Sequence, residues 1–169
     1  RDTARVPDAV LGYYVTSCNP SAIAPAVRVV VLTSRVDWLG DRGTDTSNGS
    51  EGLEGGSFAG KNLEAILVEE GNKTLESYEG VLYYKDSDFP GIVPAAMKVV
   101  RLKAAPFGKD GQALYYHDAV EELWFAEGTV SIGSYAVEGC PRLTVVHAPA
   151  SCADIAPDAF PSGVTVDRY

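Results

Sequence analysis

Apolar positions near the end of the chain recur with a spacing of 23 residues. Sliding residues 120–140 onto the segment that follows superposes Val120 on Leu143 and Leu123 on Val146. Each copy has the pattern apolar-x-x-apolar-x-apolar, followed by a turn, an isolated Ile and a small apolar pair. No stretch between these runs keeps helical spacing, so each copy predicts one short strand and an irregular return. A period of this size is typical of a solenoid, which buries its apolar residues by stacking neighbouring units.

Weaker copies of the same pattern lie upstream. One begins at Val27 and another at Leu63, at offsets of 93 and 80 residues from the two C-terminal copies. At the other end, Val166 and Tyr169 fall 23 residues after the matching positions of the last full copy, and they predict a final, truncated strand. The repeats therefore extend over most of the chain.

The remaining segments fit around this repeat. Residues 74–85 alternate around a Glu-Gly pair, which predicts a β-hairpin, and residues 97–102 predict a further strand. Residues 40–56 are rich in Gly, Ser, Thr and Asp and predict an inserted loop. Residues 1–25 match no repeat and are expected to form an N-terminal cap over the first edge of the solenoid. We therefore divide this single compact unit into a cap, residues 1–25, and a repeat domain, residues 26–169.

Two stretches, Ile132–Cys140 and Pro149–Phe160, carry the repeat pattern most faithfully, and Phe58–Ile66 running into Glu70–Asp86 carries a longer version of it. Together they resemble the BspA-type leucine-rich repeats found on bacterial and some protist cell-surface proteins, in which longer units contain an extra hairpin. The resemblance implies a mainly β or α/β fold. It would be a short, right-handed leucine-rich-repeat-like solenoid with parallel strands, little helix, an inserted hairpin and an N-terminal cap.

The same resemblance implies a noncatalytic surface or secreted module for adhesion or protein binding, located outside the cell or on its surface. Its partner would be a protein, with host or matrix proteins as candidates. Two alternatives stay open at this point. The chain could be a scaffold or accessory domain of a larger exported protein, or a hydrolase whose site the sequence does not reveal, because fold-level analogy is a weak warrant for function.

Strand periodicity predicts which side chains would form a binding face. Since side chains alternate along a strand, the neighbours of Leu123 and Phe125 point away from the core. An apolar patch that contains a Trp and is rimmed by charge is typical of a binding surface, although the cap or the hairpin could instead fold over this face and bury it. Aligning the strands predicts two rows on the open, concave face: Val31, Leu67, Trp124 and His147 in one, and Val29, Ala65, Glu122, Val145 and Arg168 in the other.

Composition narrows the range of partners. The 169 residues are 46% apolar, enough for a sizeable core, and 14 Lys and Arg against 23 Asp and Glu give a formal charge of -9. Without a concentrated basic face, the chain is not expected to bind nucleic acid or an anionic membrane. No apolar run is long enough to insert into a membrane. The chain begins at Arg1 without a signal peptide, which we interpret as loss of an export segment.

The candidates for catalysis are few. Cys18, Cys140 and Cys152 have no metal-ligand spacing, and Cys140 occupies a repeat position typical of a buried core residue. His147 and Cys152 are expected on different faces of the coil, too far apart for nucleophilic catalysis, and the pair His117-Asp118 stands alone. The Gly-rich stretch 51–56 lacks the Lys-Ser/Thr ending of a phosphate-binding loop. We therefore predict no catalytic residues and no cofactor.

The acidic runs and the glycosylation motifs do not identify a functional site either. The carboxylates Asp37, Asp41 and Asp45, and the pair Asp86 and Asp88, lack the register of a calcium-binding loop, so we expect solvated acidic surface and no metal site. The motifs Asn48-Gly-Ser50 and Asn72-Lys-Thr74 would mark exposed loops if the source glycosylates such sites.

Overall fold

A computed structural model describes the backbone of residues 3–15, 17–18, 24, 26–39, 62–87, 90–103 and 113–169. Every regular element in these ranges is a β-strand, and no helix occurs among them. The expected loop at residues 40–56 lies outside the described residues. Within the described ranges there is accordingly no helix long and apolar enough to cross a membrane.

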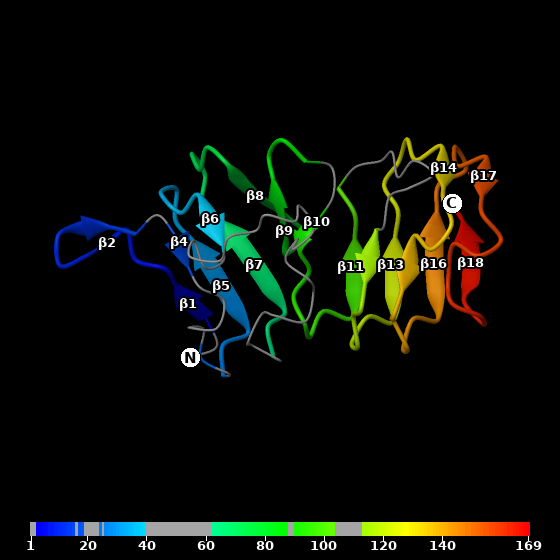
Figure 1. The fold of residues 1–169 in the computed structure, drawn as a ribbon, viewed down its shortest axis with the longest axis horizontal. Helices are drawn as coiled ribbons and strands as arrows, with labels where there is room; N and C mark the ends of the chain where they lie inside the picture. The colour runs from blue at the N-terminus through cyan, green and yellow to red at the C-terminus, as the bar shows by residue number, and fades with distance from the viewer. Residues whose placement is uncertain are drawn as a thin grey trace, which may run out of the picture.

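Two parallel sheets follow one another along the molecule (Figure 1). The first sheet has the strand order β1-β5-β7 and consists of β1 (Thr3–Arg5), β5 (Val29–Leu32) and β7 (Ala65–Val68). The second sheet has the order β11-β13-β16-β18 and consists of β11 (Val99–Arg101), β13 (Glu122–Trp124), β16 (Val145–Ala148) and β18 (Thr165–Arg168). β11 confirms the strand predicted within residues 97–102.

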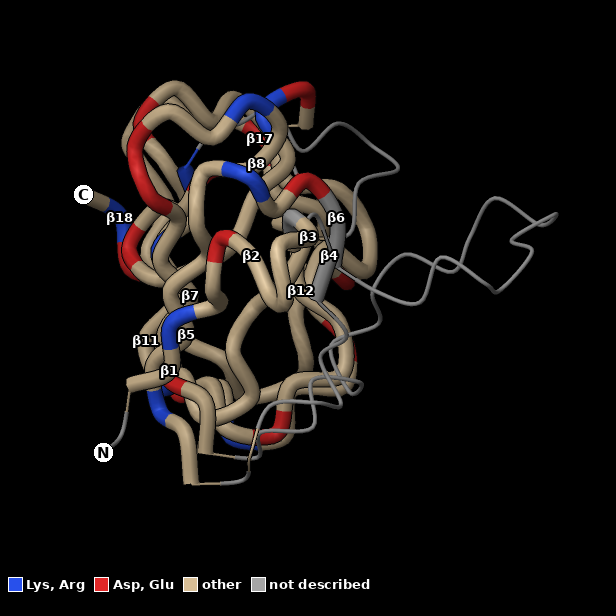
Figure 2. Tube along the Cα trace, turned by 90° about the vertical axis from the view of Figure 1, so that its left-hand side faces the viewer, with Lys and Arg blue, Asp and Glu red and all other residues tan. Residues whose placement is uncertain are grey.

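Shorter parallel pairs form the other sides of the coil. They are β4 (Ser17–Cys18) with β6 (Trp38–Leu39), β12 (Leu114–Tyr115) with β15 (Val137–Glu138), and β14 (Ser131–Ile132) with β17 (Asp154–Ile155). Looking along the coil, β1, β5, β7, β11 and β18 lie on one side and β4, β6 and β12 on the opposite side (Figure 2). The chain therefore winds around a central core, as the repeat predicted.

Two antiparallel elements depart from the coil. A hairpin of β2 (Ala9–Val10) and β3 (Tyr13–Tyr14) extends from the N-terminal end of the molecule (Figure 1). The second hairpin, β8 (Leu75–Tyr78) with β9 (Val81–Tyr84), continues into β10 (Pro90–Ile92) and lies between the two parallel sheets in sequence and in space (Figure 1). It confirms the predicted hairpin. Its turn residues Glu79 and Gly80 both have positive φ, 49° and 84°, as a two-residue hairpin turn of this kind requires.

The strand register confirms the 23-residue repeat in the second sheet. Glu122 pairs with Val145, and the same offset relates Leu114 to Val137 in the lateral pair β12–β15. The last coil is different, because Val146 pairs with Val166, an offset of 20 residues. The predicted final strand exists, but its predicted register was wrong. The last coil is three residues shorter and adds no third strand to the lateral pair β12–β15, so the chain returns to the sheet sooner.

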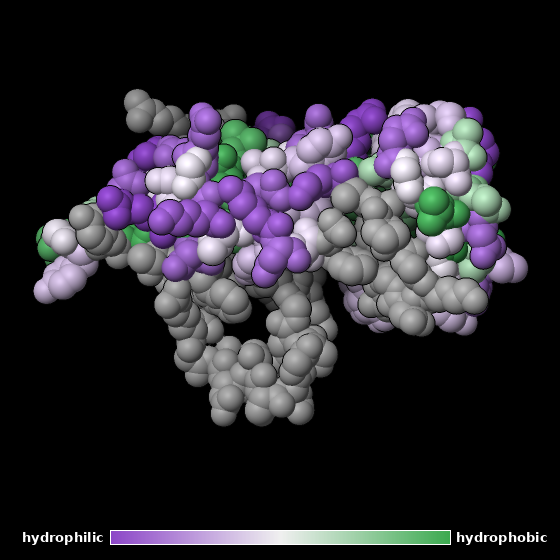
Figure 3. Space-filling view, turned by 90° about the horizontal axis from the view of Figure 1, so that it is seen from above, coloured by the Kyte–Doolittle hydropathy of each residue, from purple (hydrophilic) through white to green (hydrophobic). Residues whose placement is uncertain are grey.

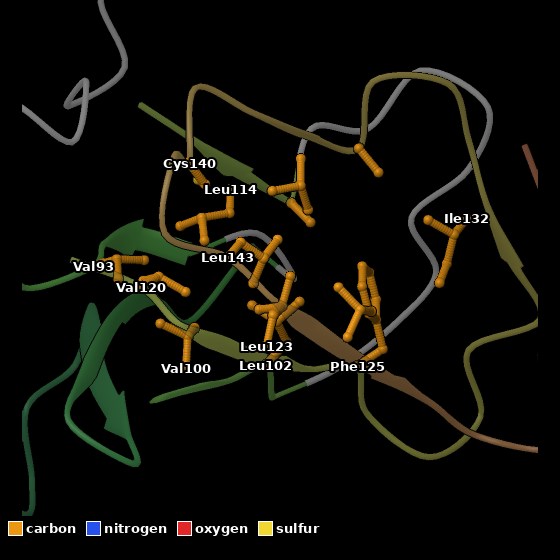
Figure 4. Packing of buried hydrophobic residues seen from close by; sticks show 14 of the residues in the cluster. Val93, Val100, Leu102, Leu114, Val120, Leu123, Phe125, Ile132, Cys140 and Leu143 are labelled. Carbon is orange, nitrogen blue, oxygen red and sulfur yellow. The ribbon is translucent and has the colours of Figure 1, made fainter. Parts of the chain in front are cut away.

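Alternate side chains of the strands build two core clusters. In the larger one, Leu123 and Phe125 are fully buried with residues from β12, β15 and β16 (Figure 4). The β8–β9 hairpin contributes to both, since Val81 and Tyr83 belong to the larger cluster and Leu82 to the smaller. The hairpin thus joins the cores behind the two sheets. Seen from above, hydrophilic side chains dominate the described surface and hydrophobic ones form small, separate patches (Figure 3).

The N-terminal segment extends the first sheet. β1 pairs in parallel with β5, with Thr3 opposite Val29 and Arg5 opposite Val31. β4 pairs with β6 on the other side of the coil. Residues of the expected cap thus satisfy the backbone groups at the edge of β5 by adding a strand to it.

Candidate binding face

The outward side of the second sheet carries a continuous row of polar and aromatic side chains. Strand register places Arg101, Trp124, His147 and Asp167 side by side, one from each of the four strands. Neighbouring strands lie about 4.8 Å apart, close enough for adjacent side chains in such a row to touch. We call these four residues the face row.

Trp124 is held between its two neighbours in the face row. The Arg101 guanidinium carbon lies 4.2 Å from the centre of the Trp124 ring, within the range of a cation–π contact. On the other side, the His147 ring stacks on Trp124 with centroids 3.7 Å apart and an angle of 14° between the planes. Trp124 Nε1 donates a hydrogen bond to Glu122, and Tyr169 lies against the indole at 5.3 Å. The indole is therefore half-buried by residues of its own sheet and by Tyr169, which follows β18.

Two carboxylates face the ring nitrogens of His147. Asp167 Oδ2 lies 3.0 Å from Nδ1, and Glu122 Oε1 lies 3.4 Å from Nε2. Directly after β18, the Tyr169 hydroxyl donates a hydrogen bond of 2.7 Å to the Phe125 carbonyl. These contacts attach the exposed terminal strand β18 to the middle of the sheet.

A second row runs beside the face row. It contains Val99, Glu122, Val145 and Thr165, which are register neighbours on the same four strands. Val99 is 43% exposed, and Val145 is half-buried. The face therefore combines exposed valine with a fixed array of aromatic and charged groups. It is more polar than the apolar patch that the sequence predicted, because Arg101 and Asp167 complete the row.

The predicted rows do not run through the whole molecule. Val31 pairs with Leu67, and Val29 with Ala65, as the alignment of the repeats predicted. These four residues belong to the first sheet, whereas Trp124 and His147 belong to the second. The hairpin element β8–β9–β10 separates the two sheets along the chain, so the prediction that both rows continue through all the strands was wrong.

The position predicted for Arg168 was also wrong. Thr165 stands beside Val145, while Arg168 pairs with Ala148 and donates a hydrogen bond to the Cys152 carbonyl. The shorter last coil shifts every residue of β18 by three positions. Arg101 was missed because the strand predicted within residues 97–102 was not aligned with the repeat, although Met97, Val100 and Leu102 fit its apolar pattern. Its offset of 23 residues from Trp124 was the available signal.

The catalytic candidates of the sequence lie apart from one another. Cys152 is buried in the larger core, and its thiol donates to the Asp154 carbonyl, whereas His147 lies on the sheet face. His117 is only 2% exposed, and burial lowers the pKa of its imidazole; Nε2 lies 3.3 Å from the Val93 carbonyl. Cys140 is buried too, and burial raises the pKa of its thiol. A reactive cysteine needs a lowered pKa, so the described geometry gives no support to a nucleophilic site. The side chain of Cys18 is outside the described part.

The acidic and glycosylation motifs can be followed only in part. Within the described ranges, no three His, Cys, Asp or Glu side chains are grouped so that they could hold a metal ion. Asp41, Asp45, Asp88 and Asn48 lie outside these ranges.

Asn72, which begins the second of the two glycosylation motifs, is buried. Its Nδ2 donates to the carbonyls of Thr33 and Val36 at 3.0 and 2.7 Å. Its Oδ1 accepts from the backbone of Thr74 and Leu75 at 3.0 and 2.8 Å. These four hydrogen bonds occupy the amide that a glycan would need, so this motif does not mark an exposed loop.

The described residues form a parallel-strand β-solenoid, as the sequence pattern predicted. No protein-family model matches the sequence, and neither does any curated protein. Three crystal structures are similar to the chain. A leucine-rich cell surface protein from Faecalibacterium prausnitzii A2-165 is 16% identical with a TM-score of 0.44, over 96% of this chain and 51% of that one.

A leucine-rich repeat protein from Eubacterium ventriosum ATCC 27560 is 16% identical with a TM-score of 0.37, over 85% of this chain and 48% of that one. The pneumococcal vaccine antigen PcpA is 14% identical with a TM-score of 0.38, over 84% of this chain and 51% of that one. This chain thus spans about half the length of the solved chains it matches.

Proposed function

We propose that this chain is a noncatalytic protein-binding module, secreted or displayed on a cell surface, which contacts its partner through the outward face of the second sheet. The observation that carries the proposal is the face row, where Arg101, Trp124 and His147 stack in contact on a sheet surface beside exposed Val99. Trp and Arg are among the residue types that supply most of the binding energy of protein interfaces.

The geometry of the row supports a protein partner. Both ring faces of Trp124 are occupied, one by Arg101 and one by His147, so the indole offers no free face for stacking on a planar or sugar ligand. What the row presents instead is a rigid, mixed polar and apolar surface. Side chains already fixed in one arrangement lose little conformational entropy on binding, which favours association with a complementary protein surface.

The position of Val99 indicates which part of the face would contact the partner. Val99 lies on β11, one strand from the carboxylate of Glu122 and two strands from half-buried Val145. This arrangement, with apolar contacts surrounded by charged groups, matches the usual anatomy of a nonobligate interface. Host or matrix proteins are the first candidates, as the resemblance to surface repeats implies.

Binding to a panel of immobilised extracellular-matrix proteins, measured by surface plasmon resonance, tests the proposal. For any matrix protein that the chain binds, Val99→Asp and Trp124→Ala should each weaken binding about tenfold or more. Val130→Asp is the matched control, because Val130 is 55% exposed but lies outside both parallel sheets. Circular dichroism and urea unfolding establish that each variant is folded.

Three results would count against this proposal. If Val130→Asp weakened binding as much as Val99→Asp, the partner would contact another side of the coil. If Val99→Asp left a measurable interaction unchanged, the face row would not be the binding surface. A chain that bound no matrix protein, and in which Val99→Asp abolished folding, would favour the competing hypothesis that the face docks a neighbouring domain.

A further inference from the structure

We propose that the outer edge of β18 binds an extended segment of a partner protein, which adds a fifth strand to the second sheet, parallel to β18. This edge lies at the Asp167 end of the face row, so the added strand would lengthen the proposed binding face. The inference rests on the proposed function only for the protein nature of the partner. The edge itself is open to test on this chain alone.

The backbone of β18 has one paired side and one open side. On the paired side, the Thr165 N–H donates to the Thr144 carbonyl at 2.9 Å. Successive backbone groups of a strand point to opposite sides, so the N–H groups of Val166 and Arg168 point to the outer edge. No strand in the described part of the chain pairs with this edge. Such an edge is a template for an added strand, and strand addition is a common mode of peptide recognition.

Val166 defines the apolar contact that the added strand would make. It stands beside Val146 in register, but Val146 is fully buried and Val166 is 37% exposed. Phe160 and Val164, which precede β18, pack against the larger core and are only partly buried. An apolar residue of the added strand, placed next to Val166, would cover this end of the core and remove apolar surface from water.

Asp167 determines the charge expected of the partner segment. It is the last residue of the face row, its side chain is 60% exposed, and its Oδ2 lies 3.0 Å from His147 Nδ1. A Lys or Arg directly beside Asp167 would extend the row with a complementary charge, whereas an acidic residue there would be repelled. We therefore expect a basic residue beside Asp167 and, one position earlier, an apolar residue beside Val166.

Arg168 limits the length of strand that is free to pair. It stands beside buried Ala148 in register, and its guanidinium donates a hydrogen bond to the Cys152 carbonyl at this end of the coil. A charged side chain that points inward is one way in which proteins blunt a sheet edge. The added strand would therefore pair mainly with residues 165–167. Because so short a contact buries little surface, we expect weak binding.

The chain itself supplies a suitable probe. β11 carries the expected pattern, because Val100 is buried and Arg101, the next residue, belongs to the face row. We would titrate the isotope-labelled chain by NMR with a synthetic peptide that has the sequence of residues 97–103, up to about 1 mM, a range suited to weak binding. The amide signals of Val166 and Arg168 should shift. A peptide of the same composition in scrambled order, which has the same net charge, should leave them unchanged.

A reversal of charge tests the role of Asp167. Asp167→Lys should weaken binding of the first peptide about two- to fivefold, the range typical of an exposed ion pair. A peptide with Glu at the position of Arg101 should bind this variant better than it binds the original chain. Asp154→Lys is the matched control, because it changes the net charge equally at an exposed aspartate on β17, and it should leave peptide binding unchanged. Circular dichroism establishes that both variants are folded.

Three outcomes would overturn the proposal. Equal shifts with both peptides would indicate general attraction of a basic peptide to a chain with a formal charge of -9. Unshifted Val166 and Arg168 signals at the highest peptide concentration would exclude strand addition at this edge. Shifts of the same signals with protein concentration alone would assign the edge to a second copy of the chain. Val99→Asp, on the opposite edge strand β11, should not affect peptide binding, so failure of this proposal and failure of the proposed function are distinguishable.

Discussion

Gly139 is the position where a single added methyl group has the clearest expected effect. Its φ is 66°, and a Cβ built on it would lie 2.3 Å from Tyr116 Cδ1 and 3.0 Å from Tyr116 Cα. Tyr116 is 59% exposed, so its ring can move away at little cost. Its Cα cannot move as easily, because the Tyr116 backbone N–H donates to the Glu138 carbonyl at 2.9 Å beside the β12–β15 pair.

The magnitude for Gly139→Ala follows from these two contributions. A non-glycine residue at positive φ costs about 1 kcal/mol. Displacing the Tyr116 backbone to relieve a contact of 3.0 Å adds roughly 1 to 3 kcal/mol, the usual cost of overpacking. We therefore expect the free energy of unfolding to fall by about 2 to 4 kcal/mol, measured by urea denaturation followed by circular dichroism.

Gly128→Ala provides the matched control. Gly128 has a φ of 85°, but a Cβ there would meet nothing within 4 Å, so only the conformational cost of about 1 kcal/mol applies. In the double variant Tyr116→Ala/Gly139→Ala the ring is removed but the contact with the Cα of residue 116 remains, so most of the loss caused by Gly139→Ala should persist. If Gly139→Ala and Gly128→Ala were equally destabilising, the close approach of Tyr116 to Gly139 would not determine stability, and this reasoning would be refuted.

The remaining predictions concern the core, a buried polar group, pH and binding. Phe125→Ala removes a fully buried ring and should cost roughly 3 to 5 kcal/mol in urea unfolding; a loss under about 1 kcal/mol would mean that the core relaxes around the cavity. Asn72→Ala leaves two carbonyls and two backbone N–H groups without their partner and should lower the free energy of unfolding by about 2 to 4 kcal/mol. An unchanged midpoint of urea unfolding would contradict these hydrogen bonds. Burial lowers the pKa of His117 below its usual value near 6.5, so the unfolded chain binds a proton more readily than the folded chain, and the free energy of unfolding falls as the pH drops below 6.5. His117→Asn should reduce this dependence of the free energy of unfolding on pH, measured by urea unfolding from pH 7 to pH 5. An unchanged pH dependence would exclude His117 as its source. In surface plasmon resonance, Val99→Asp should weaken matrix-protein binding about tenfold and Val130→Asp should not, as argued above.

The sequence by itself determined the local parts of this protein. The 23-residue period predicted that Trp124 and His147 stand side by side on neighbouring strands, and alternation predicted that they point away from the core; the register and the stacking of their rings confirm both. The hairpin around Glu79 and Gly80 was predicted equally well. These features depend on side-chain periodicity and turn chemistry over a few residues, which a single sequence contains.

Other features were decided only by the tertiary structure. The sheet divides into two because the β8–β9 hairpin fills both cores, and Arg168 leaves its predicted row because the last coil closes three residues early. Arg101 contacts Trp124 through the pairing of β11 with β13, which the sequence analysis had not aligned. Asn72 is buried and makes four hydrogen bonds to backbone groups, which its sequence motif did not indicate. These outcomes depend on which distant backbone groups need a hydrogen-bond partner and on how many residues each coil contains. The local pattern of apolar residues determines neither of them.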